Sequence, residues 1–243
     1  HFLNFTASHD GIGVRPLEGI LPTKEILDLA EEIKSTGGRV SMRKMEDGSE
    51  FPYELNATFY GALSNKKNTN LGKKRFLCSQ AIALAMKGIP AVYFHSLCGT
   101  PNYDKGVKES GQNRRINRRK WDREELNDLL KNQEENSGGI FEWYTCVLRR
   151  RASCPAFHPD ATQEILDFGK KVFALERKSG DGNQTILCLF NFSVEEVEIK
   201  KKEIVLTYFP NEKARDLIKG GELILEEGNL TLRPYQALWL CMN

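Results

Sequence analysis

The pattern of hydrophobic and polar positions divides the chain into two parts. Up to about residue 155, short apolar runs alternate with longer segments in which apolar residues recur every three or four positions. These patterns are typical of buried strands and of amphipathic helices, respectively. From about residue 162, apolar and polar residues alternate in short runs, which favours an antiparallel β-domain, namely a small sandwich. The boundary between the two parts is therefore expected within residues 155–162.

The first part predicts strands that are followed by helices. The run HFLNFT at 1–6 predicts a buried strand. A helix is expected over 24–35, capped by Thr23 and ended by Gly37-Gly38. The dipeptide Asp47-Gly48 lies between alternating segments and predicts a hairpin. The expected apolar stripe of the helix consists of Ile26, Leu27, Leu29, Ala30 and Ile33.

A second helix and a second strand follow in the same order. Residues 73–86 are apolar on a broad face and end before Gly88, and IPAVYFHSL at 89–97 predicts another buried strand. This alternation is that of a parallel sheet or barrel, although a closed barrel needs more strands than the chain supplies. Further helices are expected over 123–134 and 139–151.

The second part predicts its strands from a series of alternating runs. Turn signals separate these runs at 180–183 and at Gly220-Gly221. The runs are EILDFG, KVFALERK, TILCLFNFS, VEEVEIK, IVLTYF, ELILEEG and NLTLRPYQALWLCM.

Composition and charge limit the function classes. The chain has 243 residues and is 40% hydrophobic, which suffices for one large domain or for a medium domain with a smaller companion. Lys and Arg number 35 against 33 Asp and Glu, a balance that argues against a general polyanion binder. No apolar run approaches the roughly 20 residues of a membrane helix, and the start lacks a signal-peptide layout. We therefore expect a cytoplasmic protein, although the opening on His1 leaves an upstream targeting segment open.

The cysteines predict neither a metal site nor a redox motif. They are scattered along the chain, with no CxxC pair and no histidine at metal-ligand spacing. We therefore expect reduced, mostly buried thiols and no bound metal. The cysteines are Cys78, Cys98, Cys146, Cys154, Cys188 and Cys241.

The pair His9-Asp10 carries residues suited to chemistry. It follows the first expected strand, at the edge where α/β barrels place catalytic residues. A carboxylate there suits a general base, a nucleophile or an electrostatic stabiliser, and His9 suits hydrogen bonding to a hydroxyl group. The pair alone favours a plainer interpretation, in which Asp10 starts an Asx turn and His9 packs beneath it.

Two further stretches carry polar groups of this kind. GQNRRINRRKWD at 111–122 suits recognition of anions or hydroxyl groups. Surface solvation explains most of its basic residues, and nucleic-acid binding is disfavoured because aromatic residues are not interleaved. In FPYELNATFYGAL at 51–63, Tyr53, Glu54 and Asn56 fit either a ligand wall or the start of an amphipathic helix.

Taken together and in order, these stretches resemble the C-terminal half of glycoside hydrolase family 13. The resemblance rests on SHDGIG, PYELN, GIPAVYFHSL, NRRINR and LRPYQALWL, and it covers essentially the whole chain. The chain is most similar to the sucrose phosphorylase branch, which includes glucosylglycerate phosphorylases and sucrose 6'-phosphate phosphorylases. The resemblance implies an α/β plus all-β fold, in which residues 1–158 are the last two strand-helix units of a (β/α)8 TIM barrel. Residues 159–243 would form an appended antiparallel β-sandwich.

The resemblance also implies a retaining mechanism, in which one carboxylate attacks the anomeric carbon and a second protonates the leaving oxygen. In the family both lie on earlier barrel strands, upstream of this chain. Asp10 matches the third carboxylate, which stabilises the oxocarbenium-like transition state, and His9 and Arg114 match residues that bind the glucosyl unit. Arg115 to Lys120 are expected to be mostly structural.

The same resemblance bears on the substrate. In the phosphorylases, inorganic phosphate is the co-substrate that releases α-glucose 1-phosphate, and no other cofactor is implied. Tyr53 and Glu54 match a Tyr-Gln pair that faces the fructosyl side in sucrose phosphorylases. Glutamate in place of glutamine, together with VRPLEG at 14–19, favours a glucosylglycerate-type member. Arg15 would then pair with an acidic acceptor such as glycerate.

The parent protein is therefore expected to be a retaining α-glucosyl phosphorylase. Its expected partners are a small glucoside and phosphate, with no nucleic acid and no membrane, and the oligomeric state is left open. A sucrose phosphorylase or an α-glucosidase of the same family is the nearest alternative. The chain by itself is expected to be inactive, a carbohydrate-binding or interaction fragment with an unsealed sheet edge.

Overall fold

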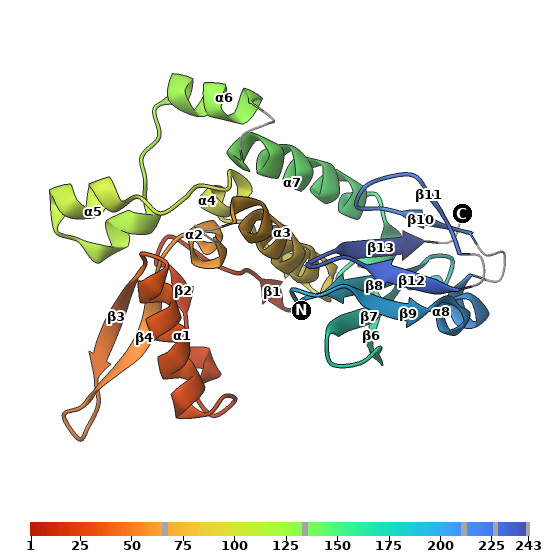
Figure 1. Cartoon of the computed structure of the whole chain (residues 1–243), viewed down its shortest axis with the longest axis horizontal. Coiled ribbons are helices and arrows are strands. Elements are labelled where there is room, and N and C mark those ends of the chain that lie inside the picture. The colour runs from red at the N-terminus through yellow and green to blue at the C-terminus, as the bar shows by residue number, and fades with distance from the viewer. Residues whose placement is uncertain (65–67, 133–135, 210–212, 226–227, 242–243) are drawn as a thin grey trace. The chain divides into compact units, whose positions relative to one another are not determined.

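The computed structural model describes residues 1–64, 68–132, 136–209, 213–225 and 228–241 (Figure 1). The chain forms two compact units, each assembled from segments that are distant in sequence. Unit 1 consists of His1–Asn4, Leu77–Ala91 and Trp143–Asn243, and unit 2 consists of Phe5–Phe76 and Val92–Glu142. The division at residue 158, which was drawn along the sequence, stays a prediction. Among the described residues, no helix is long and apolar enough to cross a membrane.

Unit 2 is built on a three-stranded antiparallel sheet in the order β2-β4-β3. Two longer helices, α3 (Thr69–Ala85) and α7 (Asn136–Ala152), contribute residues to both units. The remaining elements of unit 2 are β2 (Ile12–Gly13), η1 (Arg15–Leu17), α1 (Thr23–Ser35), β3 (Arg39–Lys44), β4 (Glu50–Asn56), α2 (Phe59–Leu63), α4 (Phe94–Leu97), α5 (Asp104–Ser110), η2 (Asn113–Asn117) and α6 (Arg123–Lys131).

Helix α1 packs its apolar face against this sheet. Ile26, Ala30 and Ile33 are buried in one core cluster with Leu55 of β4, which confirms the predicted helix. Leu27 lies outside the buried face and is exposed. The predicted Thr23 cap is wrong: Thr23 is already the first helical residue, and Pro22 before it has no side chain that could cap the helix.

The predicted hairpin is confirmed, because β3 and β4 pair antiparallel across Asp47-Gly48. The Asp47 carboxylate accepts hydrogen bonds from the backbone N and the Oγ of Ser49, at 2.9 and 2.6 Å. The helical alternative for 51–63 is wrong over PYELN, which lies in β4. Only Phe59–Leu63 are helical there, capped by Thr58, whose Oγ1 accepts from the Gly61 N at 2.9 Å. Helix α5, within the expected loop after residue 100, was not predicted.

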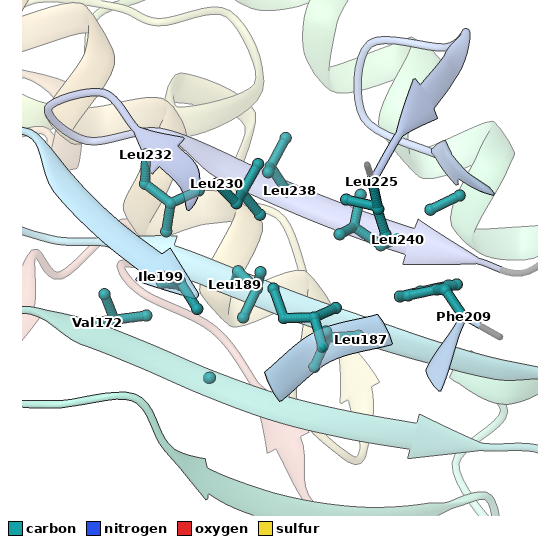
Figure 2. Packing of buried hydrophobic residues seen from close by; sticks show 13 residues of the cluster. Val172, Leu187, Leu189, Ile199, Phe209, Leu225, Leu230, Leu232, Leu238 and Leu240 are labelled. Carbon is teal, nitrogen blue, oxygen red and sulfur yellow. The ribbon is translucent and has the colours of Figure 1, made fainter. Parts of the chain in front are cut away.

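Unit 1 contains the predicted antiparallel β-domain. Six strands pair in the order β11-β10-β13-β8-β7-β6, and a second sheet consists of β12 and β9. The two sheets share a core in which Leu187 and Leu189 of β8 meet Leu230 of β12 (Figure 2). The elements of unit 1 are β1 (Leu3–Asn4), β5 (Ile89–Pro90), η3 (Pro155–Phe157), β6 (Thr162–Asp167), β7 (Val172–Lys178), β8 (Thr185–Asn191), β9 (Val197–Lys200), α8 (Lys201–Tyr208), β10 (Lys213–Asp216), β11 (Glu222–Ile224), β12 (Asn229–Leu232) and β13 (Ala237–Cys241).

Three strand predictions need correction. The run IVLTYF at 204–209 falls mostly in α8, where buried Ile204 contributes to the core from a helix instead of a strand. Within the two expected buried strands, at 1–6 and 89–97, only β1 and β5 are strands, and they pair in parallel over two residues each. Burial of such a strand requires cover on both faces, and the described residues leave Leu3 and Ile89 exposed. The second run continues into α4.

The expected burial of the thiols is largely confirmed. Cys78, Cys98, Cys154 and Cys188 are buried. Burial raises the pKa of Cys78 to about 12 and that of Cys98 to about 11. These thiols therefore stay protonated and unreactive at neutral pH.

Two arginines close the C-terminal end of α3, where a helix leaves its last carbonyl groups without partners. Arg151 Nε donates to the Leu84 carbonyl at 2.8 Å, and Arg177 Nη1 donates to the Ala85 carbonyl at 2.7 Å. Arg177 is fully buried. Burial lowers the pKa of Arg177 to about 10, so its guanidinium remains charged at neutral pH, beside the negative end of the helix dipole.

Replacing Arg177 with methionine removes these donors while keeping most of the side-chain volume. The carbonyls of Ala85, His158 and Thr162 lose a hydrogen bond each. We expect the free energy of unfolding to fall by roughly 2–4 kcal/mol, measured by urea denaturation of the protein expressed from its complete coding sequence. Lys178→Met, at the exposed neighbouring position, is the matched control and should change it by less than about 0.5 kcal/mol. Equal effects of the two substitutions would contradict the conclusion that the hydrogen bonds of Arg177 stabilise the end of α3.

Candidate functional site

The stretch ASHDGIG forms a tight turn in which Ser8 and Gly11 exchange backbone hydrogen bonds of 3.0 and 3.1 Å. The Ser8 Oγ accepts a hydrogen bond from the Asp10 N at 3.1 Å, so the side chain that organises the turn is that of Ser8. The Asx-turn interpretation is therefore wrong, and His9 is exposed where it was expected to pack beneath the turn. The carboxylate of Asp10 is left for partners outside the turn.

Gly11 allows this turn to lie against β4. Its φ is +119°, and a Cβ there would stand 2.4 Å from the Leu55 carbonyl oxygen. Only glycine adopts this conformation without strain and leaves room for the neighbouring backbone. The next residue, Ile12, pairs with Leu55, and Asn56 Nδ2 donates to the Asp10 carbonyl at 3.3 Å. Gly11 thus fixes the position of Asp10 relative to β4.

Two arginines of η2 and its C-terminal end bind the Asp10 carboxylate. Its Oδ1 lies 2.9 Å from Arg118 Nη2 and 3.4 Å from Arg114 Nη1. Arg118 Nε also donates to the His9 carbonyl at 2.6 Å. Sequence reasoning did not single out Arg118, which lies just after η2 and was grouped with residues 115–120 as mostly structural. His9 Nε2 lies 3.4 Å from Asp10 Oδ2.

A β-bulge brings both Tyr53 and Glu54 to Arg114. The register changes from Ser41 opposite Glu54 to Met42 opposite Pro52, so Tyr53 is an extra residue on β4. In a regular strand Tyr53 would share a face with Leu55, which packs in the core. In the bulged strand, Arg114 Nη2 donates to the Tyr53 hydroxyl at 3.3 Å, and Arg114 Nε donates to Glu54 Oε2 at 3.1 Å.

Glu54 is a buried carboxylate, with 6% of its surface exposed. Its Oε2 accepts hydrogen bonds from Arg114 and, at 2.9 Å, from Asn56 Nδ2. The hydrogen bond and the charge of Glu54 raise the pKa of Arg114. Asn56 is itself held by Ser41, whose Oγ donates to its Oδ1 at 2.6 Å. Two donors to one oxygen, one of them charged, therefore compensate the burial of Glu54.

Asn117, which ends η2, joins this helix to the turn at 8–11. Its buried amide donates to the carbonyls of Ser8 and His9, at 3.2 and 2.9 Å. Its own carbonyl accepts a hydrogen bond from the Tyr93 hydroxyl at 2.9 Å. Neither Asn117 nor Tyr93 was identified from the sequence, because a buried amide that bonds to backbone leaves no local pattern.

His95 packs against Tyr93, the residue that binds the Asn117 carbonyl. It is buried, its Nδ1 lies 3.1 Å from Thr100 Oγ1, and the rings of Tyr93 and Phe94 meet it edge-on. Burial lowers its pKa from an ordinary 6.5 to about 4. His95 is therefore neutral at physiological pH and serves as a structural side chain.

The structure thus brings together five of the six predicted site residues. Asp10, His9, Arg114, Tyr53 and Glu54 form one cluster in unit 2. Arg15, the sixth, begins η1 and is exposed, and it forms no ion pair with any residue that the structure describes. It follows Val14, whose N donates to the Tyr53 carbonyl at 3.1 Å.

The cluster suits electrostatic recognition of a polar ligand. The carboxylates of Asp10 and Glu54 face two guanidinium groups. The two carboxylates differ in exposure, since the Asp10 side chain is 44% exposed and that of Glu54 is 8% exposed. A carboxylate held in place at a surface can stabilise positive charge that develops on a ligand. Within the described part of the chain, no group of three or more His, Cys, Asp or Glu side chains is placed to hold a metal ion.

The chain is similar to proteins of known activity over nearly its whole length. It is 36% identical to a glucosylglycerate phosphorylase from Spirochaeta thermophila over 246 aligned residues, which cover 98% of this chain and 42% of the relative. A glucosylglycerate phosphorylase from Escherichia coli is 35% identical, over 98% of this chain and 41% of the relative. The chain therefore spans less than half the length of these curated relatives.

Two further comparisons agree with this relationship. A family model described as the amylosucrase C-terminal domain matches residues 168–241. The crystal structure of sucrose 6F-phosphate phosphorylase from Thermoanaerobacter thermosaccharolyticum superposes with a TM-score of 0.62 at 26% identity, over 75% of this chain and 35% of that protein. The resemblance inferred from the sequence motifs is thereby confirmed.

Gly11→Ala tests the close approach of the turn to β4. The substitution places a methyl group against the Leu55 carbonyl in a conformation that alanine rarely adopts. We expect the free energy of unfolding to fall by about 2 kcal/mol or more, measured by urea denaturation of the complete protein. Gly13→Ala is the control, because nothing lies within 4 Å of a Cβ there. An equally small effect at both positions would show that the turn does not need glycine.

The low pKa of His95 predicts a loss of stability in acid. The unfolded chain binds a proton at His95 below about pH 6.5, whereas the folded protein does so only near pH 4. Stability is therefore fully present above pH 6.5 and falls as the pH drops toward 4, by at most about 3 kcal/mol from this group. Urea midpoints measured between pH 7 and 4 should decline less in His95→Gln than in the wild type. The exposed His9→Gln variant is the control, and a decline that His95→Gln leaves unchanged would exclude this source.

Proposed function

We propose a function from the premise that this chain is a relative of the glucosylglycerate phosphorylases, in the sucrose phosphorylase branch of glycoside hydrolase family 13. The whole protein is a retaining phosphorylase that transfers a glucosyl unit from a glucosylglycerate-like glucoside to phosphate and releases α-glucose 1-phosphate. Residues 1–158 complete its (β/α)8 barrel, to which β1 and β5 contribute the parallel pairing. Residues 159–243 form an appended β-domain in a protein of the cytoplasm.

Asp10 carries this proposal. Its carboxylate is oriented by Arg118 and Arg114 and remains partly exposed, so its charge is fixed in place and available to a ligand. In the retaining mechanism, positive charge develops on the sugar ring while the glucosyl unit passes to and from the nucleophile. A preorganised negative charge stabilises that state more than it stabilises the uncharged substrate. His9, exposed beside Asp10, is placed to bind a hydroxyl group of the same sugar.

Tyr53 and Glu54 belong to the acceptor side of the site, and Arg114, which binds the glucosyl unit, contacts both of them as well as Asp10. Glu54 neutralises this guanidinium and orients it, so Glu54 acts on the ligand through Arg114 and the Tyr53 hydroxyl. Arg15 supplies the positive charge that an acidic acceptor such as glycerate requires, since its guanidinium is exposed and has no acidic partner among the described residues. A sucrose-type acceptor has no carboxylate and would gain nothing from Arg15.

Phosphate is the co-substrate, and we propose no further cofactor, because carboxylates perform the chemistry of the retaining mechanism. The nucleophile and the acid/base belong to the part of the protein that precedes this chain. Residues 1–243 by themselves therefore bind sugar at most and do not turn it over.

Asp10→Asn tests the central role in the protein expressed from its complete coding sequence. We expect kcat/KM for phosphorolysis of glucosylglycerate to fall by roughly 100- to 1,000-fold, because the amide keeps the shape and loses the charge. The release of glucose 1-phosphate is measured with and without phosphate. Asp28→Asn, on the exposed face of α1, is the control and should leave turnover unchanged.

The same assay distinguishes the alternatives. Release of free glucose that does not depend on phosphate would identify an α-glucosidase. A higher kcat/KM for sucrose than for glucosylglycerate would identify a sucrose phosphorylase. Turnover by residues 1–243 alone would overturn the assignment of the missing carboxylates to the rest of the protein.

A further inference from the structure

We propose that the ion pair between Glu18 and Arg43 is a positioning device that sets recognition of the acceptor. Glu18 lies in the loop at 14–21 that carries Arg15, and Arg43 lies on β3. The inference rests on the proposed function, because the ion pair acts through Arg15, the residue assigned to the acceptor carboxylate. Among the described residues, Glu18 and Arg43 form an ion pair with each other and with no member of the cluster around Asp10.

This ion pair is as short as an ordinary surface pair, and it differs from one in the exposure of its side chains. Glu18 Oε2 and Arg43 Nη2 are 2.6 Å apart, and only 32% and 29% of the two side chains are exposed. In the Lys24–Asp28 pair of α1 these fractions are 82% and 62%. Partial burial reduces screening by solvent, and a short charge-assisted hydrogen bond fixes the orientation of both side chains. The Glu18–Arg43 pair is therefore suited to holding one segment against another.

Two polar contacts attach the loop at 14–21 to the sheet, with Arg15 between them, and Val14, Leu17 and Leu21 also pack in the core of unit 2. In one contact Val14 N donates to the Tyr53 carbonyl of β4 at 3.1 Å, and in the other Glu18 binds Arg43 of β3. Arg15 and Glu18 belong to the same helical turn, since Glu18 N donates to the Arg15 carbonyl at 3.1 Å. Movement of Glu18 would therefore turn the backbone from which the Arg15 side chain extends.

The turn that carries Asp10 has separate attachments. Arg118, Asn117 and Asn56 bind it directly, and none of them contacts Glu18 or Arg43 among the described interactions. Loss of the Glu18–Arg43 pair should thus leave the glucosyl side of the site in place. Loss of the pair should therefore weaken binding of the acidic acceptor and leave the transfer of the glucosyl unit itself unchanged.

The test is made in the synthetic direction with the complete protein, glucose 1-phosphate as donor and glycerate as acceptor. We expect Glu18→Gln and Arg43→Gln each to raise KM for glycerate about fivefold with kcat changed less than about twofold. Transfer to water, measured as glucose release without glycerate, should not change. The exchanged pair Glu18→Arg with Arg43→Glu should recover most of the lost affinity, and Asp28→Asn, which breaks the exposed pair of α1, should have no effect.

Two outcomes would overturn the inference. One is an unchanged KM for glycerate in both single variants. The other is a parallel loss of acceptor transfer, transfer to water and thermal stability without recovery in the exchanged pair, which is the signature of a purely structural role. Failure of the proposed function is recognised separately, in the wild type: a protein that transfers glucose to no acidic acceptor would refute that function and this inference together, before any variant is made.

Discussion

Burial of the Glu54 carboxylate is the constraint on which the site depends. An ionised group that is removed from water is tolerated only when donors replace the lost hydration. Arg114 and Asn56 supply those donors from two different elements, so Glu54 holds η2 against β4. The guanidinium of Arg114 also reaches Asp10. The buried carboxylate and the exposed one are therefore linked through a single planar group, in addition to the contacts of Arg118 and Asn117.

In unit 1, arginine side chains also connect distant segments, but they bind backbone carbonyls instead of a carboxylate. Arg151 and Arg177 bind backbone carbonyls at the end of α3, and the partial negative charge of that helix end takes the place of a counter-ion. In both units an arginine from a late segment binds an element that is far away in sequence. The guanidinium group suits this task because its donors are rigid and point in several directions. Each unit thus gains a connection that local secondary structure cannot provide.

Much of the fold could be predicted because its signals are local. The stripe of α1, the turn residues of the β3–β4 hairpin and the alternation in most strands of unit 1 each follow from a few adjacent residues. The segment at 204–209 and the strands β1 and β5 were misjudged, because apolar residues alone indicate neither a helix nor a strand and do not reveal what covers them. The bulge at Tyr53 was missed because it depends on the register between two strands.

In the candidate site, too, local features could be predicted from the sequence and contacts between distant residues could not. Motifs in the sequence singled out Asp10, Tyr53 and Arg114, and the resemblance to a family gave them roles that stay proposals. The pairings themselves were not predictable, since Arg118 and Asn117 act on residues more than a hundred positions away. Glu54, which the resemblance places beside the ligand, accepts hydrogen bonds from Arg114 and Asn56, and its burial was not predicted from the sequence.

The bulge in β4 also limits how such a site can evolve. Because Tyr53 is an extra residue, its orientation depends on the length of the strand, and removing one residue between 50 and 56 would restore a regular pleat. Tyr53 and Glu54 would then point to opposite faces, and Arg114 would lose one of its partners. Single-residue deletions in this hairpin should therefore be selected against far more strongly than substitutions. Changes in the chemistry of the site would then arise by exchange of side chains within a hairpin of constant length.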